Sequence, residues 1–179
     1  MDKLVLNQIS FIGEEDLLNK VIKLMMSENN SNISNLIPLP KDLNKNRVYS
    51  FPEKLKNYNK YKVSTYSDWI NTYWGNEEFG DILLINTEVN KITFNFSSEF
   101  SDSKIILINI QKKFPKLKVN AVFQTEDESL IEQFETIMIN GEVFYKINNG
   151  VYYKYISSIQ LRINEIKNEC ENFGYSNVA

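Results

Sequence analysis

The chain of 179 residues has 42% hydrophobic and 24% charged residues and a net charge of −3 at pH 7. This composition is typical of a folded globular protein and excludes wholesale disorder. No stretch of about eighteen uninterrupted apolar residues occurs, and the chain does not start with an apolar run. We therefore expect neither a membrane span nor a signal peptide, and we expect the protein to be cytoplasmic.

Histidine is absent and cysteine occurs once, at Cys170. These absences exclude Ser-His-Asp triads, Cys-His pairs, HExxH zinc helices and CxxC motifs, and the glycines are too far apart for a phosphate-binding loop. The remaining enzymatic hypothesis is a magnesium site at Glu126, Asp127 and Glu128. Consecutive side chains of a strand point to alternate faces, so these three do not converge. We therefore predict a protein that is not an enzyme and that holds neither metal nor cofactor.

The first predicted elements are a strand over residues 4–12, a helix with an acidic first turn after Gly13, and a short strand over 33–37. The helix is indicated by apolar residues at helical spacing, namely Leu18, Val21, Ile22 and Met25. Residues 41–66 show weak periodicity. We predict that they form an insert that leaves the core.

A short helix is expected to begin at Ser67 and to end at Gly75, and strands over 82–86 and 91–97 follow it. In the second of these strands apolar and polar residues alternate, the apolar ones being Ile92, Phe94 and Phe96. This alternation predicts one buried face. Base stacking by the phenylalanines on an open sheet face is the alternative.

Apolar residues at four-residue steps predict a helix that ends before Pro115, with Ser101 and Asp102 as its caps. A strand over 117–123 follows. A β-meander over 134–156 is divided by two turn signals, Asn140-Gly141 and Asn148-Asn149-Gly150. The last predicted element is a helix over 157–173, whose apolar stripe is formed by Ile159, Ile163, Ile166, Cys170 and Phe173.

This order of elements predicts a single α+β domain over residues 1–179 with a ferredoxin-like split β-α-β sandwich. Its core covers about 4–40 and 67–127, and the basic segment 41–66 is inserted between them. The β-hairpin extension and the C-terminal helix either extend the sheet or cover its open face.

Several landmarks occur together along the chain. SFIGEED closes the first strand and starts the helix, IPLP ends the second strand, and Tyr73-Trp74-Gly75, FNFSSEF, Phe114-Pro115 and the two Asn-Gly turns come after them. In this order they resemble the YubB-type ferredoxin-like domain family of phage, plasmid and genomic-island proteins, over about residues 4–155. Together with the abundance of Asn, Ile and Lys, which is typical of AT-rich genomes, the resemblance implies a mobile-element protein of an AT-rich bacterium.

Residues 41–62 carry seven basic and two acidic side chains, interleaved with aromatic residues. Lysines beside aromatic rings suit single-stranded nucleic acid, because phosphates take the charge and bases stack on the rings. The residues predicted for such a site are Lys54, Lys56, Tyr58, Lys60, Tyr61 and Lys62. The alternative is a surface loop whose aromatic residues anchor it to the core.

Residues 121–142 carry six acidic side chains and no basic ones. A row of carboxylates can imitate a phosphate backbone and occupy the basic channel of a nucleic-acid-handling complex. The residues predicted for this surface are Glu126, Asp127, Glu128, Glu132 and Glu135. The alternative is a solvated bend and hairpin edge, where charge discourages edge pairing.

From the resemblance, the absent catalytic residues and the segregated charge, we predict a protein that binds and blocks a host protein or ribonucleoprotein defence complex, as an anti-CRISPR inhibitor does. Trp74 is the predicted aromatic anchor, provided that its indole is exposed. The main alternative is a single-stranded nucleic-acid-binding module that uses residues 41–62. A third is a self-assembling scaffold paired through the last helix, and the oligomeric state stays open.

Overall fold

The computed structural model describes residues 4–27, 30–75, 79–99, 103–125 and 131–156. Its centre is a seven-stranded sheet with the strand order β4-β5-β1-β6-β7-β8-β9, in which all neighbouring strands are antiparallel. The strands are β1 (Leu4–Ile12), β4 (Leu83–Glu88), β5 (Lys91–Glu99), β6 (Lys118–Thr125), β7 (Ile131–Ile139), β8 (Glu142–Ile147) and β9 (Tyr153–Lys154). A separate two-stranded ladder joins β2 (Met26–Ser27) to β3 (Asn30–Ser31).

The helices precede or connect these strands. They are α1 (Glu15–Met25), α2 (Phe51–Tyr61), α3 (Tyr66–Trp69), α4 (Lys104–Lys113), the 3-10 helix η1 (Ile33–Leu36) and the π-helix η2 (Ile70–Trp74). The chain is therefore a mixed α and β protein built on an antiparallel sheet, as the sequence predicts. No helix in the described ranges combines the length and apolarity that crossing a bilayer requires.

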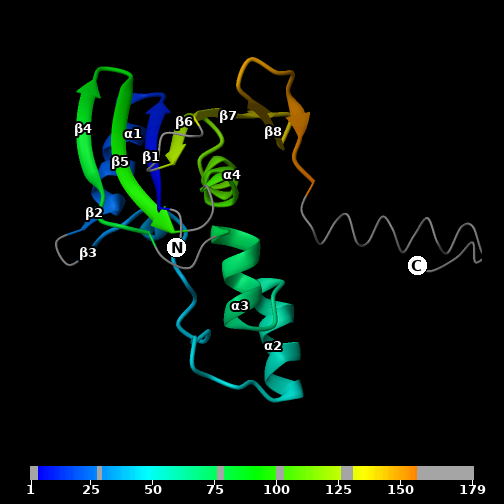
Figure 1. Cartoon of the computed structure of the whole chain (residues 1–179). Coiled ribbons are helices and arrows are strands. Elements are labelled where there is room, and N and C mark those ends of the chain that lie inside the picture. Colours follow the sequence, from blue (N-terminus) through cyan, green and yellow to red (C-terminus); the bar gives the residue numbers. More distant parts are fainter. Residues whose placement is uncertain (1–3, 28–29, 76–78, 100–102, 126–130, 157–179) are drawn as a thin grey trace, which may run out of the picture.

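One face of the sheet carries the core, and α1 and α4 cover it (Figure 1). Ile9, Phe11 and Phe94 on this face are completely buried, and the rings of Phe11 and Phe94 meet edge to face at 6.2 Å. Ile92 and Phe96 are buried on the same side of β5. The prediction of one buried face for β5 is thus confirmed, and its phenylalanines are not available for base stacking.

Two buried polar clusters tie α4 and its N-terminus to the sheet. The amide nitrogen of Asn7 donates to the Phe96 carbonyl at 3.3 Å, and its amide oxygen accepts from the Ser103 hydroxyl at 3.0 Å. Gln111 is fully buried, donates to the Leu117 carbonyl, and accepts from the Thr136 hydroxyl at 3.0 Å. These satisfied bonds fix the position of α4 over the central strands.

The predicted strand over 33–37 is wrong, because this segment forms η1. Ile33 and Leu36 are both completely buried, and their spacing of three brings them to one side of a 3-10 helix. The side chain of Asn32 accepts from the Ser34 N–H at 2.9 Å and starts the helix. The edge strand next to β5 is instead β4, which also belongs to the predicted series of strands.

The predicted insert contains an ordered helix. Within 41–66 the chain forms α2, which lies at the end of the molecule away from the sheet (Figure 1). The following helix begins with Thr65 as its N-cap, two residues before the predicted Ser67, because the Thr65 hydroxyl accepts from the Asp68 N–H. Gly75 ends this region with a φ of 75°, as predicted.

The π-helix η2 is held against α4 by Asn109. Its amide nitrogen donates to the carbonyls of Thr72 at 3.1 Å and Tyr73 at 3.2 Å. Thr72 and Tyr73 lie in the last turn of η2, where carbonyl groups lack partners within the helix, and here a neighbouring side chain bonds two of them. This contact positions the helical part of the chain relative to the sheet.

The hairpin turns follow the prediction. Asn140 and Gly141 have φ values of 51° and 79°, as the tight turn between β7 and β8 requires, and Asn148 has a φ of 52°. The predicted caps Ser101 and Asp102 and the predicted C-terminal helix over 157–173 lie outside the described residues.

Candidate functional site

Residues next to α2 in the sequence cap both ends of this helix. The carboxylate of Glu53 accepts from both the backbone N–H and the hydroxyl of Ser50 at 2.8 Å, which satisfies groups at the start of the helix. Pro52 occupies the first turn, where a missing N–H costs nothing. The helix ends where Lys62 adopts a left-handed conformation with a φ of 62°.

The inner side of α2 is held mainly by polar groups. Asn57 is buried and donates to the Ser64 carbonyl at 3.1 Å. The carboxylate of Asp42 accepts from the Tyr61 hydroxyl at 2.7 Å and from the Lys60 ammonium at 2.9 Å. The bonds to Asp42 attach the last turn of α2 to the loop that precedes the helix, and the bond of Asn57 joins the helix to the segment that follows it.

Ionisation in this segment reflects the same bonds. Hydrogen bonds from Lys60 and then from Tyr61 hold the pKa of Asp42 below its ordinary value of 3.8. The backbone N–H and the hydroxyl of Ser50, followed by the Arg47 guanidinium, lower the pKa of Glu53 from 4.5. Both carboxylates are therefore ionised at neutral pH and serve as internal anchors.

The outer side of α2 is apolar and exposed. Phe51 is 79% exposed, Leu55 52% and Tyr58 44%, and their spacing places them on one face of the helix. Lys54 and Lys62 lie beside this row, and the Lys62 ammonium is 6.0 Å from the centre of the Tyr58 ring. We call Phe51, Leu55 and Tyr58 with these two lysines the α2 face.

The structure brings the predicted basic residues to one helix but divides them between its sides. Lys54, Tyr58 and Lys62 belong to the α2 face, Lys56 is exposed, and Lys60 and Tyr61 bond Asp42. The aromatic residues near the start of α2 likewise differ in their exposure. Tyr49 is buried and accepts a hydrogen bond from the Asn44 N–H, whereas Phe51 is open to solvent.

The two acidic residues of the predicted surface that the structure describes, Glu132 and Glu135, do not share one face of the sheet. Glu126, Asp127 and Glu128 lie outside the described residues. Glu132 pairs with Phe123 on the core side of the sheet and forms an ion pair with Lys104 at the start of α4. Glu135 pairs with Asn120 on the opposite side, so the two described carboxylates project to different faces of β7.

The carboxylate of Glu135 is bound by two lysines of neighbouring strands. Its oxygens lie 2.9 Å from the Lys118 ammonium and 3.4 Å from that of Lys146. Its side chain is 14% exposed. The carboxylates of Glu132 and Glu135 are thus bound to lysines of the same chain, so these two residues do not belong to one acidic surface.

Trp74 is buried, with 9% of its surface exposed, and its indole N–H donates to the Ile37 carbonyl at 2.7 Å. Its ring meets that of Phe79 edge to face at 6.3 Å. Trp74 therefore lacks the exposure that its predicted role as an interface anchor requires. In the structure Trp74 joins η2 to the segment that follows η1.

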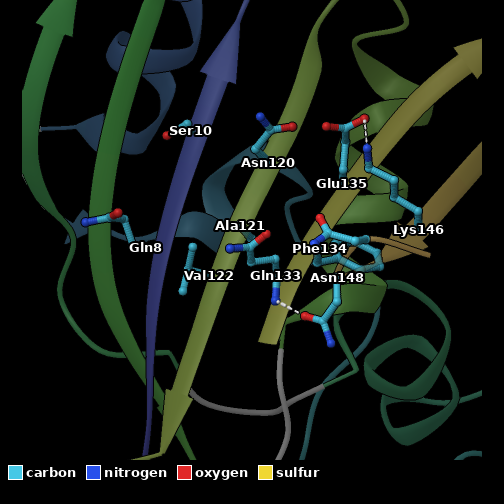
Figure 2. A pocket seen from close by; sticks show the side chains of 11 residues that line it. Gln8, Ser10, Asn120, Ala121, Val122, Gln133, Phe134, Glu135, Lys146 and Asn148 are labelled. Atoms are coloured by element: carbon cyan, nitrogen blue, oxygen red, sulfur yellow. Dashed lines mark hydrogen bonds and ion pairs between the residues drawn. The ribbon is translucent and has the colours of Figure 1, made fainter. Parts of the chain in front are cut away.

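A hollow of about 240 Å³ lies on the open face of the sheet, over β1, β6 and β7 (Figure 2). Amide side chains surround it, and the Asn148 side-chain oxygen accepts from the Gln133 N–H at 2.9 Å. This hollow could not be predicted from the sequence, because its residues come from separate strands and carry no common motif. The pair of Glu135 with Lys146 occupies one side of the hollow (Figure 2).

No protein-family model, curated protein or solved structure matches this chain.

Proposed function

We propose that this protein is a non-enzymatic binding protein that attaches to a partner protein through the α2 face. The observation that carries this proposal is the exposure of Phe51, Leu55 and Tyr58 on one side of a helix that projects from the sheet. A contiguous apolar row of this kind is typical of an interaction site. Its spacing suits insertion of the helix into a hydrophobic groove of the partner.

The attachment of α2 favours this role. Because Asp42 holds Tyr61 and Lys60, and Asn57 holds Ser64, the helix is shaped before the partner arrives. A preformed helix loses less conformational entropy on binding than a disordered segment does. Lys54 and Lys62 would steer the α2 face toward a partner with an acidic rim.

The specific form that we propose is occlusion of a bacterial defence complex in the host cytoplasm, as an anti-CRISPR inhibitor acts. This step rests on the resemblance to YubB-type proteins of mobile elements. Within the sheet, the strand order β4-β5-β1-β6 with α1 and α4 in the connections is the arrangement of a ferredoxin-like sandwich and supports that assignment of the fold. The strands β7 to β9 then extend the sandwich at one edge.

A second candidate function uses the same face. Tyr58 and Phe51 are exposed rings, and Lys54 and Lys62 lie next to them, as a site for single-stranded nucleic acid requires. This alternative predicts binding that weakens steeply with salt.

Affinity capture from a bacterial lysate, with and without nuclease, separates the two functions. The proposal predicts a protein complex that survives nuclease and is lost from the double variant Phe51→Ala, Leu55→Ala. The control variant is Val151→Ala. Val151 is 67% exposed and lies on the distant β8–β9 connection, so this variant should still capture the complex. Capture of nucleic acid alone, abolished by nuclease, would establish the second function and overturn the first.

A further inference from the structure

The strand β4 is an edge of the seven-stranded sheet, and every one of its side chains is exposed. Leu83 is 63% exposed and Ile85 53%. The sequence LLINTE contains neither lysine nor proline, the residues that commonly protect such an edge. Among the described strands none pairs with the outer side of β4, so its backbone groups there are a template for another strand.

A groove of about 260 Å³ lies between α1 and the C-terminal end of β4, where Thr87 and Glu88 line it. Its floor contains Leu18 and Ile92, which are almost completely buried, and Glu15 and Asn19 of α1 line its wall. An apolar floor with a carboxylate at the wall fits the aliphatic stem and the charged end of a lysine or arginine side chain.

We propose that β4 binds a short extended segment of a partner protein by antiparallel or parallel strand addition, with a basic side chain of that segment in the α1–β4 groove. The backbone of the segment would supply the hydrogen bonds, and Glu15 would select the charge. This site is separate from the α2 face and does not depend on the function proposed for it.

The structure favours a short segment over a second copy of the chain. The pairing of β4 with β5 shifts register between Leu84 and Asn86, and such a bulge limits long, flat edge-to-edge pairing. Antiparallel pairing of two β4 strands would also bring Asp81 at one end of each copy toward Glu88 of the other. Like charges in that position oppose dimerisation, whereas a basic segment would place opposite charges beside Asp81 and Glu88.

The test uses the full chain and a nine-residue peptide of alternating valine and lysine, with a valine–glutamate peptide as control. We expect the lysine peptide to bind, to slow amide hydrogen exchange in residues 83–88, and to leave exchange in α2 unchanged. Two further lysine peptides carry methyl groups on alternate backbone nitrogens, in the two possible phases. Strand addition predicts that one phase binds and that the other loses at least about tenfold in affinity, because several backbone hydrogen bonds are lost.

Glu15→Gln should weaken binding of the lysine peptide about two- to fivefold, the range for an exposed charge pair. Glu14→Gln is the matched control, since Glu14 is also exposed but does not line the groove, and it should leave the affinity unchanged. Equal binding of both methylated phases, unchanged exchange in 83–88, or preference for the glutamate peptide would overturn the proposal. So would a dimer that protects β4 without any peptide.

Discussion

The hydroxyl of Tyr61, at the end of α2, donates to the carboxylate of Asp42 at 2.7 Å. The same oxygen of Asp42 accepts from Lys60. Two residues that sequence analysis assigned to nucleic-acid binding therefore hold their own helix in place. The remaining side of α2 carries the exposed apolar row, so the polar bonds on one side determine what the other side presents to a partner.

This anchor predicts a dependence on pH. Because the folded-state pKa of Asp42 lies below its ordinary value of 3.8, its stabilising effect is fully present above that value and is lost as the pH falls through the lower, folded-state pKa. The same sign holds for Glu53, whose pKa lies below 4.5. Amide exchange in α2, corrected for its intrinsic pH dependence, should accelerate in this acidic range before exchange in β1 and β6 does. Simultaneous acceleration in α2 and the sheet would contradict the prediction.

Gly75 is expected to tolerate no side chain. Its φ is +75°, and a Cβ atom would lie 2.8 Å from Cβ of Ile105 on α4. We predict that Gly75→Ala lowers the free energy of unfolding by about 2–4 kcal/mol, from left-handed strain and overpacking together. Gly141→Ala is the matched control, because Gly141 has a φ of +79° with nothing within 4 Å, and should cost about 1 kcal/mol. Urea denaturation measures both, and equal losses would contradict the steric argument.

The buried bond between Thr136 and Gln111 joins β7 to α4. Thr136→Val removes the hydroxyl and leaves the Gln111 oxygen without this donor, so we predict a loss of about 1–2 kcal/mol in unfolding free energy. In a double-mutant cycle, Thr136→Val and Gln111→Met together should lower the unfolding free energy by less than the sum of the two single losses. Additive losses would mean that the hydrogen bond contributes nothing measurable.

Glu132 and Glu135 are predicted to play no part in partner binding, because they project to opposite faces and bond to lysines of the same chain. The double variant Glu132→Gln, Glu135→Gln should capture the partner from a nuclease-treated lysate within about twofold of the unaltered chain, because neither carboxylate is free to meet a partner. A loss of tenfold or more would restore the hypothesis of a phosphate-mimicking acidic surface.

The sheet was predictable where burial imposes alternation, as in β5 and β6, and where Asn-Gly demands a positive φ. The α2 helix was not, because its apolar residues Phe51 and Leu55 face solvent while its inner side uses Asn57 and Tyr61. Helical periodicity predicts a helix when its apolar residues are buried and its polar residues face solvent, which is the opposite of what α2 shows. The short apolar run at η1 fits a strand or a 3-10 helix equally well, and tertiary packing decides between them.

For the acidic residues a usable signal was present. Glu132 and Glu135 are separated by an odd number of positions, which places them on opposite faces of any strand. The sequence carries no such signal for the burial of Trp74, because that burial depends on contact with Ile37 across the insert.

The central claim, that the α2 face binds a partner protein, is tested most directly by photo-crosslinking in bacteria that express the chain. The photoreactive residue p-benzoylphenylalanine replaces Leu55 in one variant and Val151 in another. We predict one dominant protein adduct from position 55 and none from position 151. No protein adduct at position 55, an adduct with nucleic acid there, or the same adducts at both positions would contradict the account.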